Sequence, residues 1–428
     1  MQRGSGIRTL QVLDTEFNAD TVEWCPVYSY HHILACGTYQ LLPQEEEDVP
    51  PIRKGRLHLW RYQQEAKTSH LTEIQTIDMS AILDIKCYLA RCHVAVSGKV
   101  LMGLAASNGE LQVHTLSPEQ EGSVSLQVIN NKKVSAGLVL SLDWSTGRMD
   151  SSDVKVVCSD STGSVSVFSL HQTHLSPVTH LRAHDYEAWI SAFSYWDTNL
   201  VYSGGDDCKL KGWDLRMDSS TPTFTSKRHS MGVCSIHSNP HREHILATGS
   251  YDEKVLLWDG RSMRAPVSES TLGGGVWRLK WHPSHHHLLL AACMHNHIHV
   301  LNTQHSTEAA GGACPVVASY VLHNSLAYGA DWSQLPVGEP APPAPSPTLS
   351  KPADGHLKIQ YESPTGSLDT CLEDHSGRYV PEDLGAAASA GEVVGRHGNT
   401  SSFLLASCSF YDHVLHLWRW DYLADGTC

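Results

Sequence analysis

The chain has 428 residues, of which 45 are acidic and 31 basic, so its net charge is −14 with histidine neutral. No lysine- or arginine-rich cluster stands out, which argues against direct nucleic-acid binding because phosphate neutralisation supplies much of that affinity. No apolar run approaches membrane-spanning length, no apolar signal core opens the chain and the twelve cysteines show no paired spacing, so we predict a cytoplasmic (cytosolic) protein with reduced thiols and no membrane contact.

Seven copies of one pattern follow each other along the chain. In each copy, an apolar segment precedes a strand of small residues, a tight turn and a strand that ends in a bulky residue. The opening segments start at Val22, Ile82, Leu140, Trp189, Val233, Val276 and Tyr328. A period of about 40–45 residues with Trp-Asp closing the third strand, as at Trp213 and Trp258, is typical of WD repeats. We therefore predict an all-β fold, a seven-bladed WD-repeat β-propeller that forms a single domain over residues 8–420, with little helix.

The N-terminal strand and the last copy complement each other. The final strand, Val414–Trp418, has little chain after it to form an outer strand, whereas Thr9–Leu13 is a strand without a copy of its own. We predict that this N-terminal strand completes blade seven and closes the ring, which removes exposed sheet edges.

Two segments do not fit the repeat. Residues 43–55 form an acidic insertion that contains Glu45-Glu-Glu-Asp48, and residues 334–400 are rich in Pro, Ala, Gly and Ser. The second lies between the first two strands of blade seven. We predict that both are disordered, because such sequences bury too little apolar surface to offset the entropy of ordering.

Some residues that could imitate a catalytic triad recur with the repeat. In WD repeats a His, a Ser or Thr, an Asp and the closing Trp form a hydrogen-bonded structural cluster. In this chain the set is His184, Ser203, Asp207 and Trp213 in blade four, and His229, Asp252 and Trp258 in blade five, where either Thr248 or Ser250 supplies the hydroxyl. The recurrence favours a structural role over a catalytic one.

One position before the turn Asp has no role in that cluster and is expected at the rim of the central channel. Aligned copies place Tyr39, Asp206, Tyr251, His295 and Tyr411 there, and neighbouring loops add Glu187, Arg228 and Trp277. Two interpretations stay open at this point, an ordinary polar rim and a ligand pocket at the channel mouth.

The 28 histidines include a dense patch at His295, His297 and His299, which would share one face of a strand. No cysteine or carboxylate completes a familiar ligand spacing beside them, so no metal is predicted. The sequence also lacks a Gly-x-Ser-x-Gly elbow, a phosphate loop and a dinucleotide fingerprint, and we predict no cofactor.

Several long blocks resemble one particular WD-repeat family. They include Asp20–Pro26, His31–Gln40, Glu187–Phe193, Tyr202–Asp207, Ser226–Ile236, Pro240–Glu253, Gly274–Pro283, His285–His295 and Cys408–His413. Together they are similar to the diphthine methylesterases, the WD-repeat proteins of diphthamide biosynthesis. The similarity covers about residues 8–333 and 403–420, but neither insertion.

The resemblance implies hydrolysis of the methyl ester of a modified histidine on translation elongation factor 2, with other diphthamide-pathway enzymes as further partners. The substrate carries a trimethylammonium group beside the ester. On this basis His295 is expected as general base and Arg228 as oxyanion donor. Tyr39, Tyr251, Trp277 and Tyr411 would bind substrate, with Asp206 or Glu187 balancing its cation. A covalent route through Cys293 is the alternative, although its strand position favours a buried structural thiol.

A competing function is a non-catalytic adaptor. Trp213-Asp-Leu-Arg216 and Trp258-Asp-Gly-Arg261 match the short Trp-Asp-x-Arg pattern of substrate receptors in cullin-RING ubiquitin ligases. A bare assembly platform for the diphthamide enzymes is a third possibility.

Overall fold

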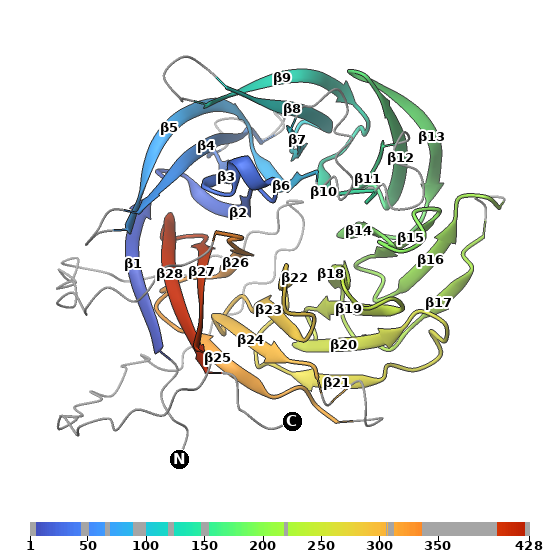
Figure 1. Cartoon of the computed structure of the whole chain (residues 1–428). Coiled ribbons are helices and arrows are strands. Elements are labelled where there is room, and N and C mark those ends of the chain that lie inside the picture. Colours follow the sequence, from blue (N-terminus) through green and yellow to red (C-terminus); the bar gives the residue numbers. More distant parts are fainter. Residues whose placement is uncertain are drawn as a thin grey trace. The chain divides into compact units, whose positions relative to one another are not determined.

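The computed structural model describes residues 6–43, 51–64, 69–88, 100–118, 124–146, 154–217, 221–304, 306, 312–335 and 400–423. Within these ranges 28 strands form seven antiparallel four-stranded sheets, each of which is one blade around a central channel (Figure 1). The predicted seven-bladed propeller is therefore confirmed. A short 3-10 helix, η1 (Tyr28–Tyr30), is the single helix in the described part of the chain, and no described helix is long and apolar enough to cross a membrane.

The strands of blades one to four follow one another from the channel outwards. Blade one holds β2 (Asn18–Trp24), β3 (Ile33–Leu41), β4 (Arg53–Gln64) and β5 (Ser69–Ser80). Blade two holds β6 (Ile82–Cys87), β7 (Val100–Ala106), β8 (Glu110–Pro118) and β9 (Val124–Lys133). Blade three holds β10 (Val139–Trp144), β11 (Val154–Asp160), β12 (Ser164–His171) and β13 (His174–Arg182). Blade four holds β14 (Ile190–Phe193), β15 (Leu200–Gly204), β16 (Leu210–Asp214) and β17 (Phe224–Ser226).

The remaining three blades continue the same order. Blade five holds β18 (Val233–Ser238), β19 (Ile245–Ser250), β20 (Lys254–Asp259) and β21 (Ser268–Thr271). Blade six holds β22 (Arg278–Trp281), β23 (Leu288–Ala292), β24 (Ile298–Asn302) and β25 (Val316–Tyr320). Blade seven holds β26 (Ala327–Trp332), β27 (Thr400–Ser409), β28 (Val414–Leu423) and, as its outermost strand, β1 (Gly6–Asp14).

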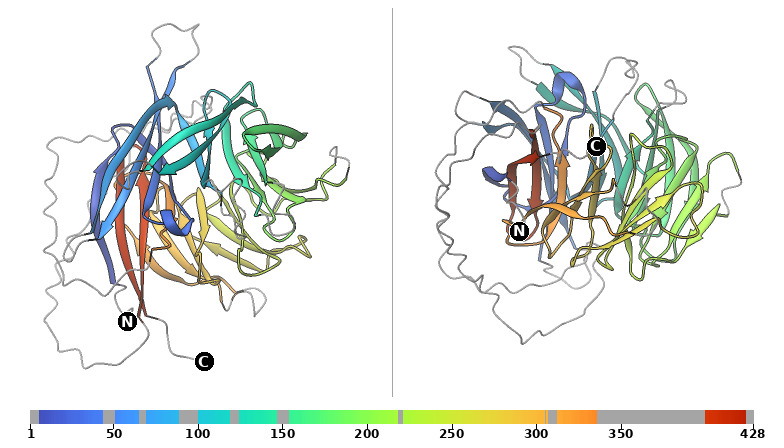
Figure 2. Two further views of the ribbon diagram at one scale, coloured as in Figure 1. Left: turned by 45° about the horizontal axis from the view of Figure 1, so that its top comes forward. Right: turned by 60° about the horizontal axis from the view of Figure 1, so that its bottom comes forward.

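The N-terminal strand closes the ring as predicted. Strand β1 pairs antiparallel with β28 from Gly6 opposite Asp421 to Asp14 opposite Val414. The blue start of the chain therefore lies beside its red end in every view (Figures 1 and 2). Because the two ends of the sequence share one sheet, the ring is held together by backbone hydrogen bonds as well as by packing.

Apolar side chains fill the spaces between blades. Every neighbouring pair of blades has its own buried cluster, for example Leu59 with Ile85 between blades one and two, and Leu34 with Leu417 between blades seven and one. The described cysteines are free thiols, mostly buried in these clusters. Residues 44–50 and 336–399, the main parts of the two insertions predicted to be disordered, lie outside the described residues.

The recurring His, Ser or Thr, Asp and Trp residues form hydrogen-bonded clusters inside their blades. In blade four, the two ring nitrogens of His184 lie 2.8 Å from Asp207 and 2.8 Å from Ser203, whose hydroxyl also accepts from the Trp213 indole at 2.9 Å. Blade five repeats this arrangement with His229, Asp252 and Trp258, and its hydroxyl comes from Thr248. These side chains are therefore occupied in holding inner strands to turns.

Candidate active site

The end of the channel formed by the turns between second and third strands is filled by aromatic rings. One apolar cluster there takes residues from all seven blades, and its rings are Tyr39, Trp189, Tyr251, Trp277, Tyr328, Phe410 and Tyr411. We call this the aromatic end. Ring centroids lie 5.7 Å apart for Trp189 and Trp277, 4.8 Å for Trp277 and Tyr328, and 4.9 Å for Tyr328 and Phe410. A void of about 10 Å³ beneath this cluster is too small for a ligand.

Four residues predicted at the rim, Tyr39, Tyr251, Trp277 and Tyr411, belong to this packed cluster. A predicted anion, Asp206, accepts a hydrogen bond from the Trp189 indole at 3.0 Å, so it orients one of the rings. The backbone carbonyl of Glu187 accepts from the Asp206 N–H at 2.9 Å. In the part of the chain that the structure describes, this mouth is thus filled by the protein's own side chains. The ligand pocket that was one of the two interpretations of this rim stays a prediction.

The predicted base and oxyanion donor lie apart from each other. His295 is exposed in the turn between β23 and β24 of blade six. Arg228 lines a groove beside the outer strand β17, where its guanidinium donates to the Arg264 carbonyl at 3.3 Å. No hydrogen bond or ion pair joins Arg228 to His295 in the part of the chain that the structure describes. The structure does not bring these two residues together, and their catalytic roles stay predictions.

Two further sequence candidates lie at this end, the Cys293 thiol and the histidine patch. Cys293 is fully buried, which raises the pKa of its thiol far above the usual value, and its sulfur contacts the Ala291 carbonyl. The expectation that His295, His297 and His299 share a strand face is wrong, because His297 has a φ of 60° in the turn and β24 begins after it. Among the described residues no group of three or more His, Cys, Asp or Glu is arranged for a metal ion.

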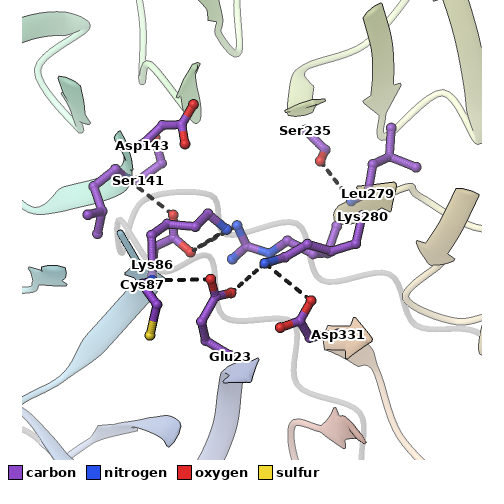
Figure 3. A network of polar contacts seen from close by, with 12 residues as sticks. Glu23, Lys86, Cys87, Ser141, Asp143, Ser235, Leu279, Lys280 and Asp331 are labelled. Carbon is purple, nitrogen blue, oxygen red and sulfur yellow. Dashed lines mark hydrogen bonds and ion pairs between the residues drawn. The ribbon is translucent and has the colours of Figure 1, made fainter. Parts of the chain in front are cut away.

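The opposite end of the channel holds a cavity of about 390 Å³. We call this the open end. It is surrounded by one residue from each blade, always the second-last residue of the innermost strand. These seven residues, which we call the channel ring, are Glu23, Lys86, Asp143, Ala192, His237, Lys280 and Asp331. Figure 3 shows several of them converging from different blades. Because the seven innermost strands are arranged alike around the channel, residues at the same position of each strand form a ring.

Four members of the channel ring connect neighbouring blades. Each accepts a hydrogen bond from a backbone N–H at the end of the next blade's innermost strand. The pairs are Asp331 with Trp24 at 2.8 Å, Glu23 with Cys87 at 3.2 Å, Asp143 with Phe193 at 2.9 Å and His237 with Trp281 at 2.9 Å. This structural task accounts for an acceptor at these positions, and all four side chains also line the cavity.

The charges of the ring are unevenly compensated. Lys280 forms ion pairs with Glu23 and, at 3.5 Å, with Asp331. Asp84, two residues before Lys86 in β6, lies 3.4 Å from Lys86 and 3.0 Å from Arg278. Among the described residues, Asp143 has no such ion pair. Burial raises the pKa of its carboxyl to about 7, despite the hydrogen bond from Phe193 and the charge of Lys86. Burial also raises the pKa of Asp331, to about 6, although Lys280 lies beside it.

Asp143, Tyr195 and His237 lie together around the position of Ala192. The Tyr195 hydroxyl donates to the Asp143 carboxylate at 3.3 Å, and the Tyr195 and His237 rings are 5.6 Å apart. Burial lowers the pKa of His237 well below its usual value, so the ring is neutral. Since Nδ1 accepts from the Trp281 N–H, the proton of this neutral ring is on Nε2.

This group of side chains has the parts that hydrolysis requires. A carboxylate with a pKa near 7 can take a proton from water at neutral pH, and a neutral N–H can donate to an oxyanion. The aromatic lining of the cavity adds Trp144, Trp281 and Trp332, whose indoles donate to the carbonyls of Lys86, His237 and Lys280. None of these residues was singled out as a candidate from the sequence. In several blades the sequence signal was a polar residue before the bulky last residue of the inner strand, as in Glu23-Trp24, Asp143-Trp144 and Asp331-Trp332.

Comparisons with known proteins agree with this architecture. The family described as WD domain, G-beta repeat, matches residues 220–259. A protein named diphthine methyltransferase from Mus musculus is 45% identical over 97% of this chain and 94% of its own length. Its Homo sapiens counterpart of the same name is 43% identical, covering 97% and 99%. A diphthine methyltransferase homolog from Dictyostelium discoideum is 36% identical over 76% of this chain and 92% of its own.

Solved structures share the fold at low identity. A chain from the crystal structure of the mitotic checkpoint complex superposes with a TM-score of 0.58 and 14% identity, covering 99% of this chain and 94% of that chain. Such a likeness supports the propeller architecture alone.

Proposed function

The chain belongs to the diphthine methyltransferase family, and from this membership we propose that it hydrolyses the methyl ester of diphthine methyl ester on translation elongation factor 2. In this reaction water adds to the ester carbonyl and the bond to the methoxy group breaks. The products are the carboxylate, which is diphthine, together with methanol and a proton. The protein would thus act as a carboxylic ester hydrolase within diphthamide biosynthesis.

The observation that carries this proposal is the carboxyl of Asp143, which has a pKa of about 7 and lines a cavity of about 390 Å³. Its carboxylate takes a proton from the attacking water. His237 Nε2–H and the ammonium group of Lys86 stabilise the negative charge that develops on the carbonyl oxygen. The protonated carboxyl of Asp143 then returns the proton to the departing methoxy oxygen.

The substrate's trimethylammonium group also finds suitable surroundings in this cavity. Quaternary ammonium groups bind to aromatic faces and to negative charge. Trp144, Trp281 and Trp332 supply aromatic surface, and their indole hydrogen bonds to backbone carbonyls fix their orientation. The carboxylates of Glu23 and Asp331 supply negative charge at the same wall.

The name of the relatives describes methyl transfer, whereas our proposal is methyl removal. Two reactions with purified protein distinguish the directions. Elongation factor carrying the methyl ester should release methanol, and elongation factor carrying diphthine should gain no methyl group when a sulfonium methyl donor is added. Mass spectrometry of the modified histidine reports both results. Methylation of diphthine without methanol release in the first reaction would overturn the proposal in favour of transfer.

The adaptor function keeps one specific observation in its favour. Arg216 and Arg261 are paired with their own Asp214 and Asp259, and their side chains are 55% and 68% exposed. They are thus accessible to a ligase subunit. Under the esterase proposal the variant with both arginines changed to alanine keeps its rate of methanol release. Capture of cullin-RING subunits by the wild type, lost in this variant and without methanol release by either, would favour the adaptor.

A further inference from the structure

In six of the seven blades the channel-ring residue has a charged or polar side chain. In blade four this residue is Ala192, which has only a methyl group. Ala192, in β14 of blade four, lines the cavity between Asp143 and His237. We propose that the space above Ala192 binds the ester-bearing side chain of the substrate and that Ala192 determines which side chains can enter. This inference rests on the proposed function, because it places the ester between the groups assigned to hydrolysis.

The backbone position itself does not require a small residue. The same position carries Glu23 in blade one, Lys86 in blade two and Lys280 in blade six, each with the same strand pairing. From this position the longer side chains contact other blades around the channel, as Lys280 does when it pairs with Glu23 and Asp331. A long side chain at 192 would accordingly enter the part of the cavity that Asp143, Tyr195 and His237 border.

A structural explanation for the alanine must also be considered. Ala192 lies directly opposite Tyr202 in the β14–β15 pair, whereas Glu23 lies opposite Ala35. Residues directly opposite in an antiparallel pair share a face, so a small residue at 192 gives room to the Tyr202 side chain. Tyr202 does not line the cavity, and its ring is 6.2 Å from that of Phe224 on the outer strand. Tyr202 thus accounts for a small residue at 192 without filling the space above it.

This alternative decides the design of the experiment. Tyr202→Ala alone removes the tyrosine packing and leaves the space above Ala192 open. The double variant Ala192→Glu with Tyr202→Ala has the same packing loss and recreates the Glu–Ala pair of blade one, but it fills the space. The comparison between these two variants therefore isolates occupation of the cavity from damage to the blade.

Two quantities are measured for each variant. The first is kcat/KM for methanol release from methyl-esterified elongation factor 2, and the second is the Kd for elongation factor carrying diphthine, by calorimetry. We expect the double variant to lose about 100-fold in kcat/KM relative to Tyr202→Ala, because displacement of the reacting group by an ångström already has that effect. Its Kd should rise at least about 10-fold relative to Tyr202→Ala.

The two failures are distinguishable. Equal kcat/KM and equal Kd for the double variant and Tyr202→Ala would overturn the role of Ala192 and leave hydrolysis untouched. A wild-type protein that binds the diphthine form but releases no methanol would overturn hydrolysis, and the difference in Kd would still decide whether the side chain binds above Ala192. A wild-type protein that does not bind the diphthine form would overturn the inference on Ala192.

Discussion

The two ends of the channel are built from the same seven innermost strands, but their side chains have opposite properties. At the aromatic end, residues from all seven blades pack into one apolar cluster. At the open end, six polar side chains and Ala192 surround a cavity of about 390 Å³. Blades otherwise contact mainly their two neighbours, so a cluster shared by all seven fixes the ring as a whole. The comparison suggests that packing at one end stabilises the propeller and leaves the other end for chemistry.

The largest effect is expected at the open end, from Asp143→Asn. The amide oxygen can still accept the hydrogen bond from the Phe193 N–H, and the amide has no charge to bury, so the unfolding temperature at neutral pH should rise rather than fall. The amide cannot take a proton from water, and loss of a general base lowers rates by about 10²–10⁴-fold. Methanol release and thermal unfolding, measured on the same preparation, test both parts.

Asp331→Asn is the matched control for this variant. Asp331 also accepts a backbone N–H from the next blade and lines the same cavity, but it forms an ion pair with Lys280 and transfers no proton in the proposed reaction. Its substitution should lower the rate much less than Asp143→Asn does. Equal rates for Asp143→Asn and the wild type would remove Asp143 from the mechanism.

A substitution at the aromatic end is expected to lower the stability of the protein and to leave its catalytic rate unchanged. Phe410 is 7% exposed, and its ring lies 4.9 Å from Tyr328 and 6.0 Å from Tyr39. Phe410→Ala should lower the free energy of unfolding by about 3–5 kcal/mol, as large-to-small core changes do. Denaturant unfolding gives this value, and kcat measured well below the unfolding transition should stay near wild type. A large loss of kcat in a fully folded variant would show that the two ends are not separable in this way.

A pH profile sharpens the same comparison. The base must be ionised, so kcat/KM should rise with pH through about 7 and then level off. The raised pKa also means that the folded state keeps this proton between about pH 4, the usual range of an Asp, and about pH 7. Through that window the carboxyl makes folding less favourable as pH rises. Unfolding free energies of wild type and Asp143→Asn should consequently diverge from pH 4 to 7 and run parallel above it. Parallel curves throughout would contradict the raised pKa.

The fold could be predicted from the sequence because each blade has the same alternation of strands and turns. The spare strand at Thr9–Leu13 and the last strand at Val414–Trp418 were enough to predict how the ring closes, and β1 does pair with β28. The match to the WD-repeat pattern also predicted the pairing of His184 with Asp207, and the structure has their side chains 2.8 Å apart.

The candidate site was harder to find, and the reason is geometric. Alignment of turns showed that Tyr251 and Tyr411 reach the channel mouth, but it could not show that rings from seven blades fill that mouth. The channel ring was visible as a polar residue before a bulky one, as in Glu23-Trp24. A single repeat does not reveal that such a residue faces the cavity. The raised pKa of Asp143 arises from burial by several blades and has no signature in one segment.

The smallest effect concerns the face on which the substrate protein docks, and two exposed tyrosines test it. Tyr28, in η1 of blade one, is 89% exposed and follows Pro26, which lines the cavity at the open end. Tyr186 is 64% exposed and precedes Trp189 of the aromatic end. Because the reacting side chain must enter the cavity, its protein should contact the face that carries Tyr28. Truncation of an interface tyrosine often costs about 1–2 kcal/mol, so Tyr28→Ala should raise the Kd for elongation factor 2 about 10-fold. Tyr186→Ala should leave the Kd unchanged, and the reverse pattern would move docking, and the proposed site with it, to the aromatic end.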